Sequence, residues 1–420
     1  MTVIRPFQAV RPKKELASSI AALPYDVYSR KEALEAVKAR PLSFLRIDRP
    51  ETQFPEDTDM YSKPVYDKAK DLLEAMRSDG SYIQDETPCY YIYTLTMNNR
   101  SQTGLVGCAS VNDYLENRIK KHENTREDKE ADRIRHVDTL SAQTGPIFLT
   151  CRADARLKRI LNDAKQSAPL YDFTMEDQVR HQVWKIDDAD TVRKLYEIFC
   201  SIDNIYIADG HHRAASAVKV ALKRRDEYPN YTGNEEFNYF LSVLFASDEL
   251  QIYDYNRIVS DLNGHTFEEF LGELKKNFDV KEMGEQPVRP SCKGEIGLYG
   301  NGSWYLLKVN PVLIPDDPVA RLDVSILQDM ILEPLLGIHD PKTDSRIQFV
   351  GGIRGLKILS ETVDAGKGGA AFSMYPTSME ELLSVADAGR LMPPKSTWFE
   401  PKLLSGLFIH PFEKDLSGTA

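Results

Sequence analysis

One short segment of the chain combines residue types that bind anions with the local structure that such binding requires. Residues 209–213 read Asp-Gly-His-His-Arg and follow the apolar run 205–208. That run predicts a buried strand, and the alanine-rich stretch 214–225, which has no glycine or proline, predicts a helix. The segment therefore lies at a helix N-terminus, where unpaired backbone N–H groups and the helix dipole attract negative charge.

Each residue of this turn can contribute to a site for a phosphate group. Gly210 lets the backbone approach a ligand closely, and Arg213 can donate charge-assisted hydrogen bonds to phosphate oxygens together with His211 or His212. Asp209 can hold a magnesium ion or orient a hydroxyl group. The sequence therefore predicts a phosphate site.

Two other interpretations fit the turn less well. In a purely structural one, Asp209 caps the helix, Gly210 makes the turn and the histidines are solvated. A bare cap requires neither two histidines nor an arginine, so we favour the phosphate site. Zinc is disfavoured because adjacent histidines point in different directions and the chain has neither an HExxH segment nor a CxxC pair.

The turn resembles the phosphate-binding motif of the ParB/sulfiredoxin-like superfamily. This superfamily includes the ParB nucleotide switch, sulfiredoxin and an archaeal kinase of free serine. Of these, the kinase has the motif most similar in residue sequence. Sulfiredoxin-like enzymes have Gly-Cys-His-Arg at this place, with the cysteine as the reacting group. Here His211 stands at the position of that cysteine, which argues against sulfinic-acid reduction.

A second resemblance covers nearly the whole chain. Five segments together look like a bacterial family of about this length, described as of unknown function or loosely as SpoOJ/ParA/ParB/RepB-like. They are residues 24–27, 122–125, 145–149, 209–213 and 392–402. For residues 24–27, a plain turn is the favoured interpretation, with Asp26 as a candidate ligand contact only through this resemblance.

Glu123 is the candidate base. In the serine-kinase relatives a His-Glu pair at a comparable place resembles His122-Glu123, and by that resemblance Glu123 acts on the substrate hydroxyl. The alternative is a solvated helix face, because residues 116–136 contain six acids and seven bases.

The C-terminal run 391–407 predicts an ordered loop. Its three prolines exclude regular structure, while the Trp-Phe pair at 398–399 is costly to expose. From such a loop, Lys395, Ser396 and Lys402 can reach phosphates. The alternative is a loop that only closes a core.

Composition limits the class of protein. The chain has 420 residues, of which 42% are hydrophobic and 28% charged, as is ordinary for a soluble globular protein. It has no long apolar run and no signal peptide, so we expect a cytoplasmic protein without a membrane span, and the five scattered cysteines suggest reduced thiols. A net charge of −11 argues against a nucleic-acid partner and favours a small anionic ligand. The oligomeric state does not follow from the sequence.

The element pattern predicts an α+β protein with a ParB/sulfiredoxin-like mixed module and additional α/β segments on both sides. We expect an N-terminal segment at 1–111, the phosphate- and nucleotide-binding module at 112–262, and a C-terminal segment at 263–420. Helices are expected at 30–39, 64–77, 125–140, 189–200, 214–225, 267–277, 323–335 and 378–388. Hairpins are expected at 89–111 and 295–309, further strands at 147–150, 205–208, 238–246, 250–260, 347–350 and 356–360, and a linker at 283–294.

The leading functional hypothesis is a phosphotransferase that moves a phosphoryl group from ATP or ADP, with Mg²⁺, to a small hydroxylated metabolite. The serine-kinase resemblance makes serine the first guess. Phosphoryl transfer requires mainly positioning and charge neutralisation. Gly210–Arg213 would hold the phosphates, Asp209 the magnesium or the substrate, and Glu123 would be the base, with His212 and Arg213 neutralising developing charge. The alternatives are a non-catalytic ParB-like nucleotide switch and a phosphatase acting on a phosphometabolite.

Overall fold

The computed structural model describes residues 1–125 and 127–412. These residues form two compact units. Unit 1 comprises Met1–Leu250 together with the C-terminal segment that begins at Pro401, and unit 2 comprises Gln251–Glu400. In the described part of the chain, no helix combines the length and the apolar character that crossing a membrane requires.

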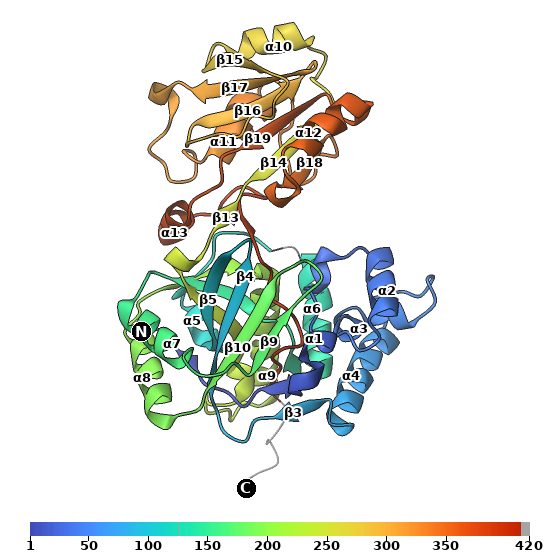
Figure 1. Cartoon of the computed structure of the whole chain (residues 1–420), viewed down its shortest axis with the longest axis vertical. Helices are drawn as coiled ribbons and strands as arrows, with labels where there is room; N and C mark the ends of the chain where they lie inside the picture. The colour runs from blue at the N-terminus through green and yellow to red at the C-terminus, as the bar shows by residue number, and fades with distance from the viewer. Residues whose placement is uncertain (126, 413–420) are drawn as a thin grey trace. The chain divides into compact units, whose positions relative to one another are not determined.

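Unit 1 is built around a nine-stranded mixed sheet of order β6-β11-β8-β12-β5-β4-β10-β9, with β1 beside β5 (Figure 1). The strands are β1 Ile4–Arg5, β4 Tyr90–Met97, β5 Arg100–Ser110, β6 Ile119–Lys120, β8 Ile147–Cys151, β9 Tyr171–Thr174, β10 Arg180–Ile186, β11 Ile205–Asp209 and β12 Tyr239–Ala246. Most neighbours are antiparallel, but β6 runs parallel to β11 and β8 parallel to β12. The central strands β4 and β12 are apolar and buried along nearly their whole length, as expected for strands covered on both faces.

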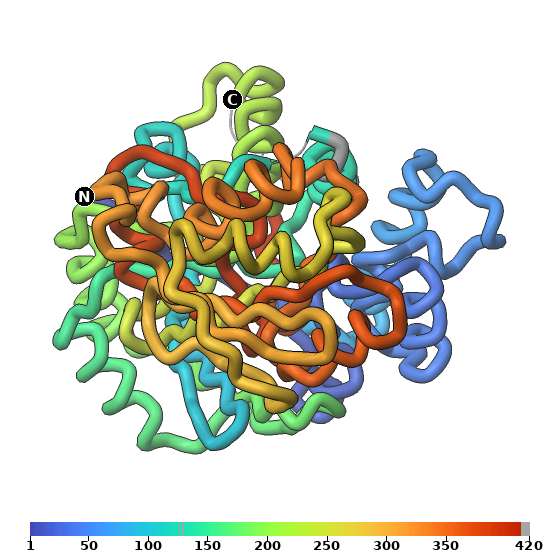
Figure 2. Tube along the Cα trace, turned by 90° about the horizontal axis from the view of Figure 1, so that it is seen from above, coloured from blue at the N-terminus to red at the C-terminus, as the bar shows by residue number. Residues whose placement is uncertain are grey.

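Nine α-helices surround this sheet within the described residues of unit 1. They are α1 Ala17–Ile20, α2 Arg30–Ala39, α3 Leu45–Asp48, α4 Lys63–Ser78, α5 Val111–Leu115, α6 Glu127–Leu140, α7 Ala155–Ala164, α8 Ala189–Cys200 and α9 His211–Glu227. One apolar cluster joins the sheet to α7, α8 and α9, and a second lies among the N-terminal helices. Those helices, drawn in blue, gather on one side of unit 1 in both Figure 1 and Figure 2.

Unit 2 is an antiparallel sheet of order β15-β17-β16-β19-β14-β18 with helices. Its strands are β14 Tyr255–Val259, β15 Phe278–Gly284, β16 Glu295–Gly300, β17 Ser303–Val309, β18 Ile347–Gly351 and β19 Ala370–Met374, and β13 Ile252–Tyr253 pairs separately with β20 Trp398–Phe399. Its α-helices are α10 Phe267–Leu274, α11 Asp323–Leu327, α12 Lys357–Thr362 and α13 Met379–Asp387.

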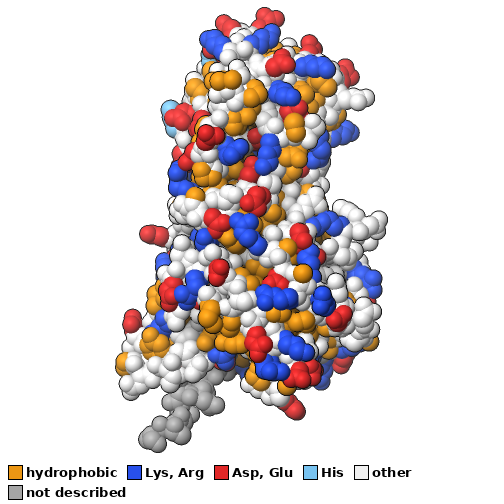
Figure 3. All heavy atoms as spheres, turned by 90° about the vertical axis from the view of Figure 1, so that its left-hand side faces the viewer, with side chains coloured by type: hydrophobic (Ala, Val, Ile, Leu, Met, Phe, Trp, Pro, Cys, Tyr) orange, Lys and Arg blue, Asp and Glu red, His pale blue; other side chains and the backbone are white. Residues whose placement is uncertain are grey.

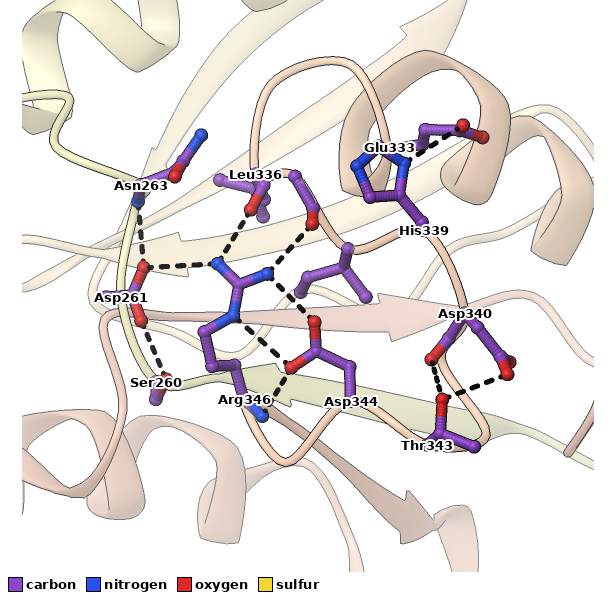
Figure 4. A network of polar contacts seen from close by, with 12 residues as sticks. Ser260, Asp261, Asn263, Glu333, Leu336, His339, Asp340, Thr343, Asp344 and Arg346 are labelled. Carbon is purple, nitrogen blue, oxygen red and sulfur yellow. Dashed lines mark hydrogen bonds and ion pairs between the residues drawn. The ribbon is translucent and has the colours of Figure 1, made fainter.

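An arginine holds the segment that follows α11. Arg346 donates hydrogen bonds to the carbonyls of Leu336 and Gly337 at 3.0 and 2.9 Å, and it pairs with Asp344 at 2.8 Å (Figure 4). Arg346 therefore satisfies carbonyl groups that the end of the helical segment would otherwise leave unpaired. These contacts account for a structural role.

The α+β class is confirmed, and most expected elements lie where the sequence pattern put them. The expectation of a strand at 356–360 is wrong, because α12 occupies these residues. A short apolar run fits either structure, and the buried Leu356 and Leu359 have helical spacing. Helix α7, strand β19 and the β9–β10 hairpin were not predicted, and the expected linker at 283–294 lies inside unit 2. Strands of the first two predicted segments share one sheet, and the three-segment division stays a prediction.

The buried sheet of unit 1 makes a stability prediction. Leu244 on β12 is 0% exposed, whereas Leu222 on α9 is 39% exposed. Leu244→Ala should lower the free energy of unfolding of unit 1 by about 2–5 kcal/mol because it leaves a cavity. Leu222→Ala is the matched control and should cost under about 0.5 kcal/mol. Urea unfolding followed by circular dichroism measures both, and equal effects would contradict the described packing.

Candidate functional site

The 209–213 turn joins β11 to α9 through a glycine with a left-handed backbone. Gly210 is the N-cap of α9, with φ of 95° and no side-chain capping hydrogen bond. Asp209 instead accepts the N–H of Gly210 through Oδ1 at 3.0 Å. The interpretation of Asp209 as the helix cap is therefore wrong. Pairing between β11 and β8 is irregular between Ile207 and Asp209, and such bulges redirect side chains next to functional sites.

Position 210 strongly favours glycine. A Cβ atom there would lie 3.2 Å from Cζ, Nε and an Nη atom of Arg213, and the positive φ is unfavourable for other residues. The close approach packs the Arg213 guanidinium against the turn. The first N–H groups of α9 are thus left without a side-chain cap, as an anion site requires.

Two cations flank the Asp209 carboxylate. Its Oδ2 lies 3.3 Å from Nζ of Lys402 and 3.8 Å from Nη2 of Arg213. Burial alone would raise the pKa of Asp209, but the charges of Lys402 and Arg213 hold that pKa well below its usual value. Lys402 comes from the C-terminal segment of unit 1. Its contact with Asp209 places this predicted residue at the turn.

Arg213 is also anchored to the start of β8. It donates a hydrogen bond to the carbonyl of Pro146 at 2.6 Å, and its side chain is 13% exposed. The 145–149 segment and the 209–213 turn are therefore neighbours in space. The orientation of Arg213 is set by the Pro146 carbonyl and by Asp209.

His211 and His122 form a buried pair at the ends of β11 and β6. Because these strands run parallel, their carboxyl ends meet at one edge of the sheet. The two imidazole rings pack edge to face with 4.5 Å between centroids, and the backbone N–H of His122 donates to Nε2 of His211 at 3.5 Å. Burial lowers the pKa of His122 to about 4, against the opposing charge of Asp209, and lowers the pKa of His211 well below its usual value. Both rings are neutral at pH 7.

Glu123 lies beside this pair. Its Oε2 is 3.8 Å from Nδ1 of His211, and its side chain is 45% exposed. Since Nε2 of His211 accepts the His122 N–H, the ring proton belongs on Nδ1, facing Glu123. His212 is half-buried, and its carbonyl accepts the hydroxyl of Ser216 at 2.7 Å. The structure thus gathers Glu123 and all five residues of the turn.

A pocket opens beside Arg213 and is lined by groups that the sequence interpretation missed. They include Tyr25, Asp48, Arg133, His136 and Thr144. The Arg133 guanidinium lies 4.0 Å from the centre of the Tyr25 ring and pairs with Asp132 at 2.8 Å. Burial raises the pKa of Tyr25 to about 12, against the opposing charge of Arg133. Tyr25 is therefore a neutral phenol at the pocket.

Two expectations need correction at this pocket. The solvated interpretation of the 116–136 segment holds for only one face of α6: residues 127, 131 and 135 are exposed, whereas Glu130, Arg133 and His136 are buried. Their spacing of three residues was the available signal, but the mixed charges obscured it. Residues Tyr25–Val27 form a 3₁₀ helix whose Tyr25 lines the pocket, so they do more than make a plain turn.

Lys395 and Ser396 belong to unit 2, apart in sequence from the unit 1 segment that carries Lys402. The Ser396 hydroxyl donates to the carbonyl of Pro393 at 2.6 Å, and the Lys395 carbonyl accepts from Arg257 at 3.1 Å. The predicted loop is thus held by a hydrogen bond of its own and by one from Arg257 on β14, and it is divided between the units after Glu400. Phosphate binding by Lys395 and Ser396 stays a prediction.

The donor set at the turn does not fit a magnesium ion held by the protein alone. In the residues that the structure describes, no group of three or more His, Cys, Asp or Glu side chains is arranged for a metal. Asp209 already faces two cations. Magnesium at Asp209 stays a prediction.

A family model for proteins of unknown function, DUF1015, matches residues 4–325. The chain belongs to this family. No curated protein matches the chain. The family description makes no ParB or SpoOJ-like assignment, so that resemblance stays a prediction.

Solved structures show only weak likeness. A mutant free serine kinase in complex with ADP is 14% identical, with 73% of this chain and 87% of that chain covered and a TM-score of 0.35. The protein SbnI with a C-terminal truncation, from Staphylococcus aureus, is 11% identical, with 74% and 90% covered and a TM-score of 0.39. A conserved hypothetical protein from Pyrococcus furiosus is 14% identical, with 69% and 91% covered and a TM-score of 0.33. These scores establish neither a shared ligand nor a shared reaction.

The ion contacts of Asp209 predict a pH dependence of stability. A carboxyl group whose pKa is lowered by folding stabilises the protein above its unfolded pKa, and the contribution is lost as pH falls below that value. The stability advantage of the wild type over Asp209→Asn should therefore shrink between about pH 6 and about pH 3, where unfolded Asp takes up its proton. Denaturant unfolding at several pH values measures this difference in the free energy of unfolding between the wild type and Asp209→Asn. In a Lys402→Met background, the stability advantage of Asp209 over asparagine should fall less as the pH is lowered. A stability advantage that does not change with pH would contradict the contacts of Asp209.

Proposed function

We propose that unit 1 is a nucleotide-dependent phosphotransferase that acts on the hydroxyl group of a small molecule. The observation that carries the proposal is the N-terminus of α9, which has no side-chain cap and lies against Arg213 and Lys402. N–H dipoles without a side-chain cap, beside two cations, match a phosphate group in charge and in hydrogen-bonding capacity. We infer that the donor nucleotide, ATP or ADP, places its phosphates there.

Asp209 keeps the two cations in position before the ligand arrives. Lys402 and Arg213 both approach the same carboxylate oxygen, Oδ2. Arg213 has five N–H donors and Lys402 has three, so each cation can contact a phosphate while it stays beside Asp209. His212, the second residue of α9, adds a donor at the helix end. Such positioned charge stabilises the transferred phosphoryl group.

Glu123 is our candidate for the base. It is accessible at 45% exposure, and the neutral His211 presents its Nδ1 proton toward it. In the transfer, the bond from phosphorus to the leaving nucleotide oxygen breaks and a bond to the acceptor oxygen forms. The acceptor proton passes to Glu123. His211 would orient the carboxylate without changing its own charge.

Magnesium would enter with the nucleotide in this proposal. Mg²⁺ is commonly bound by substrate phosphates and one or two carboxylates, and Asp209 is the carboxylate at this turn. The metal would neutralise charge on the phosphates. The protein groups described above supply the positioning.

Arg213→Lys tests the phosphate site. Lysine keeps the charge but loses the planar fork and the contact with Pro146, so ADP affinity should fall by about tenfold. Calorimetry on the full chain measures the dissociation constant. Arg225→Lys is the matched control at the other end of α9, where Arg225 contacts Asn238 and Asn112, and it should leave ADP affinity unchanged. Unchanged affinity in Arg213→Lys would exclude this phosphate site.

Glu123→Gln tests catalysis. The reaction is followed by phosphorus NMR with ATP or ADP, Mg²⁺ and a panel of hydroxylated metabolites. Removing the base should lower turnover by about 10²–10⁴ while nucleotide affinity stays nearly constant. Glu116→Gln, an exposed acid near β6, is the control and should keep wild-type turnover. If Glu123→Gln retains turnover, Glu123 is not the base. If the wild type transfers no phosphoryl group to any metabolite of the panel, the proposed function is refuted.

A further inference from the structure

The pocket beside Arg213 contains a buried carboxylate that has the charge of Arg133 nearby but forms no ion pair among the described residues. Asp48, the last residue of α3, is 3% exposed. Its side chain accepts one hydrogen bond, from the Thr144 hydroxyl to Oδ1 at 3.0 Å, and within the described residues it forms no ion pair. A buried carboxylate usually has several donors or a cationic partner. Asp48 therefore has capacity to accept further hydrogen bonds from a ligand.

The same pocket also carries positive charge. Arg133 and Arg213 line it together with Asp48. Arg133 is paired with Asp132 at 2.8 Å, whereas Arg213 lies 3.8 Å from Asp209. Arg213 thus has the weaker carboxylate contact of the two and is better able to receive an anionic group. The pocket wall presents a carboxylate and a guanidinium that are not paired with each other.

We propose that this pocket binds a small molecule that carries both an ammonium and a carboxylate group. The ammonium would donate to Asp48, and the carboxylate would accept from Arg213. An inorganic anion alone would bring negative charge beside Asp48, and a simple amine would leave its cation beside two arginines. A ligand with both charges can pair with both Asp48 and Arg213.

The inference deepens the proposed function, since a hydroxyl-bearing ligand of this class would be the phosphoryl acceptor. Only this acceptor role rests on the proposed function. The binding chemistry follows from Asp48, Thr144 and the arginines alone. It can therefore be tested without a nucleotide.

The test uses three small hydroxylated probes that differ in their charged groups. L-Serine has both an ammonium and a carboxylate, ethanolamine lacks the carboxylate, and L-lactate lacks the ammonium. Calorimetry on the full chain without nucleotide should find L-serine bound at least about tenfold more tightly than either of the others, as charge-assisted hydrogen bonds predict. Equal affinities, or no binding of L-serine, would overturn the proposal. The three affinities are compared on the wild-type protein.

Asp48→Asn then identifies the ammonium contact. The substitution should remove the advantage of L-serine over L-lactate and keep its advantage over ethanolamine. A merely structural effect would weaken all three probes alike, which would also overturn the assignment. Asp113→Asn, a buried carboxylate outside the pocket that pairs with Arg118, is the control and should keep the wild-type ranking. Melting temperatures of both variants report on folding.

The two proposals fail in different ways. An intact ranking of the probes without phosphoryl transfer would contradict the proposed function alone. Phosphoryl transfer with equal affinities for the three probes would contradict the pocket assignment alone.

Discussion

The electrostatic balance around Asp209 is the interaction on which the site depends. A carboxylate at the end of a buried strand is costly unless cations or donors compensate it. Here Gly210 supplies a backbone N–H, and Lys402 and Arg213 supply charge. These contacts tie the end of β11 to the first turn of α9 and to the C-terminal segment of unit 1. The same compensation holds two cations next to a helix N-terminus that has no cap.

The site gathers segments that are distant in the sequence. Parallel pairing of β6 with β11 brings His122 and Glu123 to the turn, and the start of β8 brings Pro146 to Arg213. Helix α6 packs against α9 and contributes Arg133 to the neighbouring pocket. Four of the five segments that prompted the whole-chain resemblance therefore contribute to one region of unit 1, and the fifth contributes its final residue, Lys402. On the face shown in Figure 3, lysine, arginine and acidic side chains are interspersed.

Local signals explain what could be predicted from the sequence. The strand, the glycine turn and the helix at 205–225 follow from short-range propensities, and the expected positions of β11 and α9 are confirmed. Asp48 and Arg133 could not be found in this way, because their role depends on long-range packing of α3 and α6. Tyr25 lay in a recognised segment but had no local sign of burial. The C-terminal loop shows the same limit, since no sequence feature indicated that Lys395 and Lys402 belong to different units.

Backbone NMR of the helix N-terminus tests the central claim most directly. Pyrophosphate added to the full chain, with His, Arg and Gly labelled by ¹⁵N, should shift the amide resonances of Gly210, His211, His212 and Arg213 more than those at the far end of α9. Saturable shifts confined to the turn are the predicted result. Absence of shifts there, or larger shifts elsewhere in the protein, would contradict the assignment of this helix N-terminus as the phosphate site.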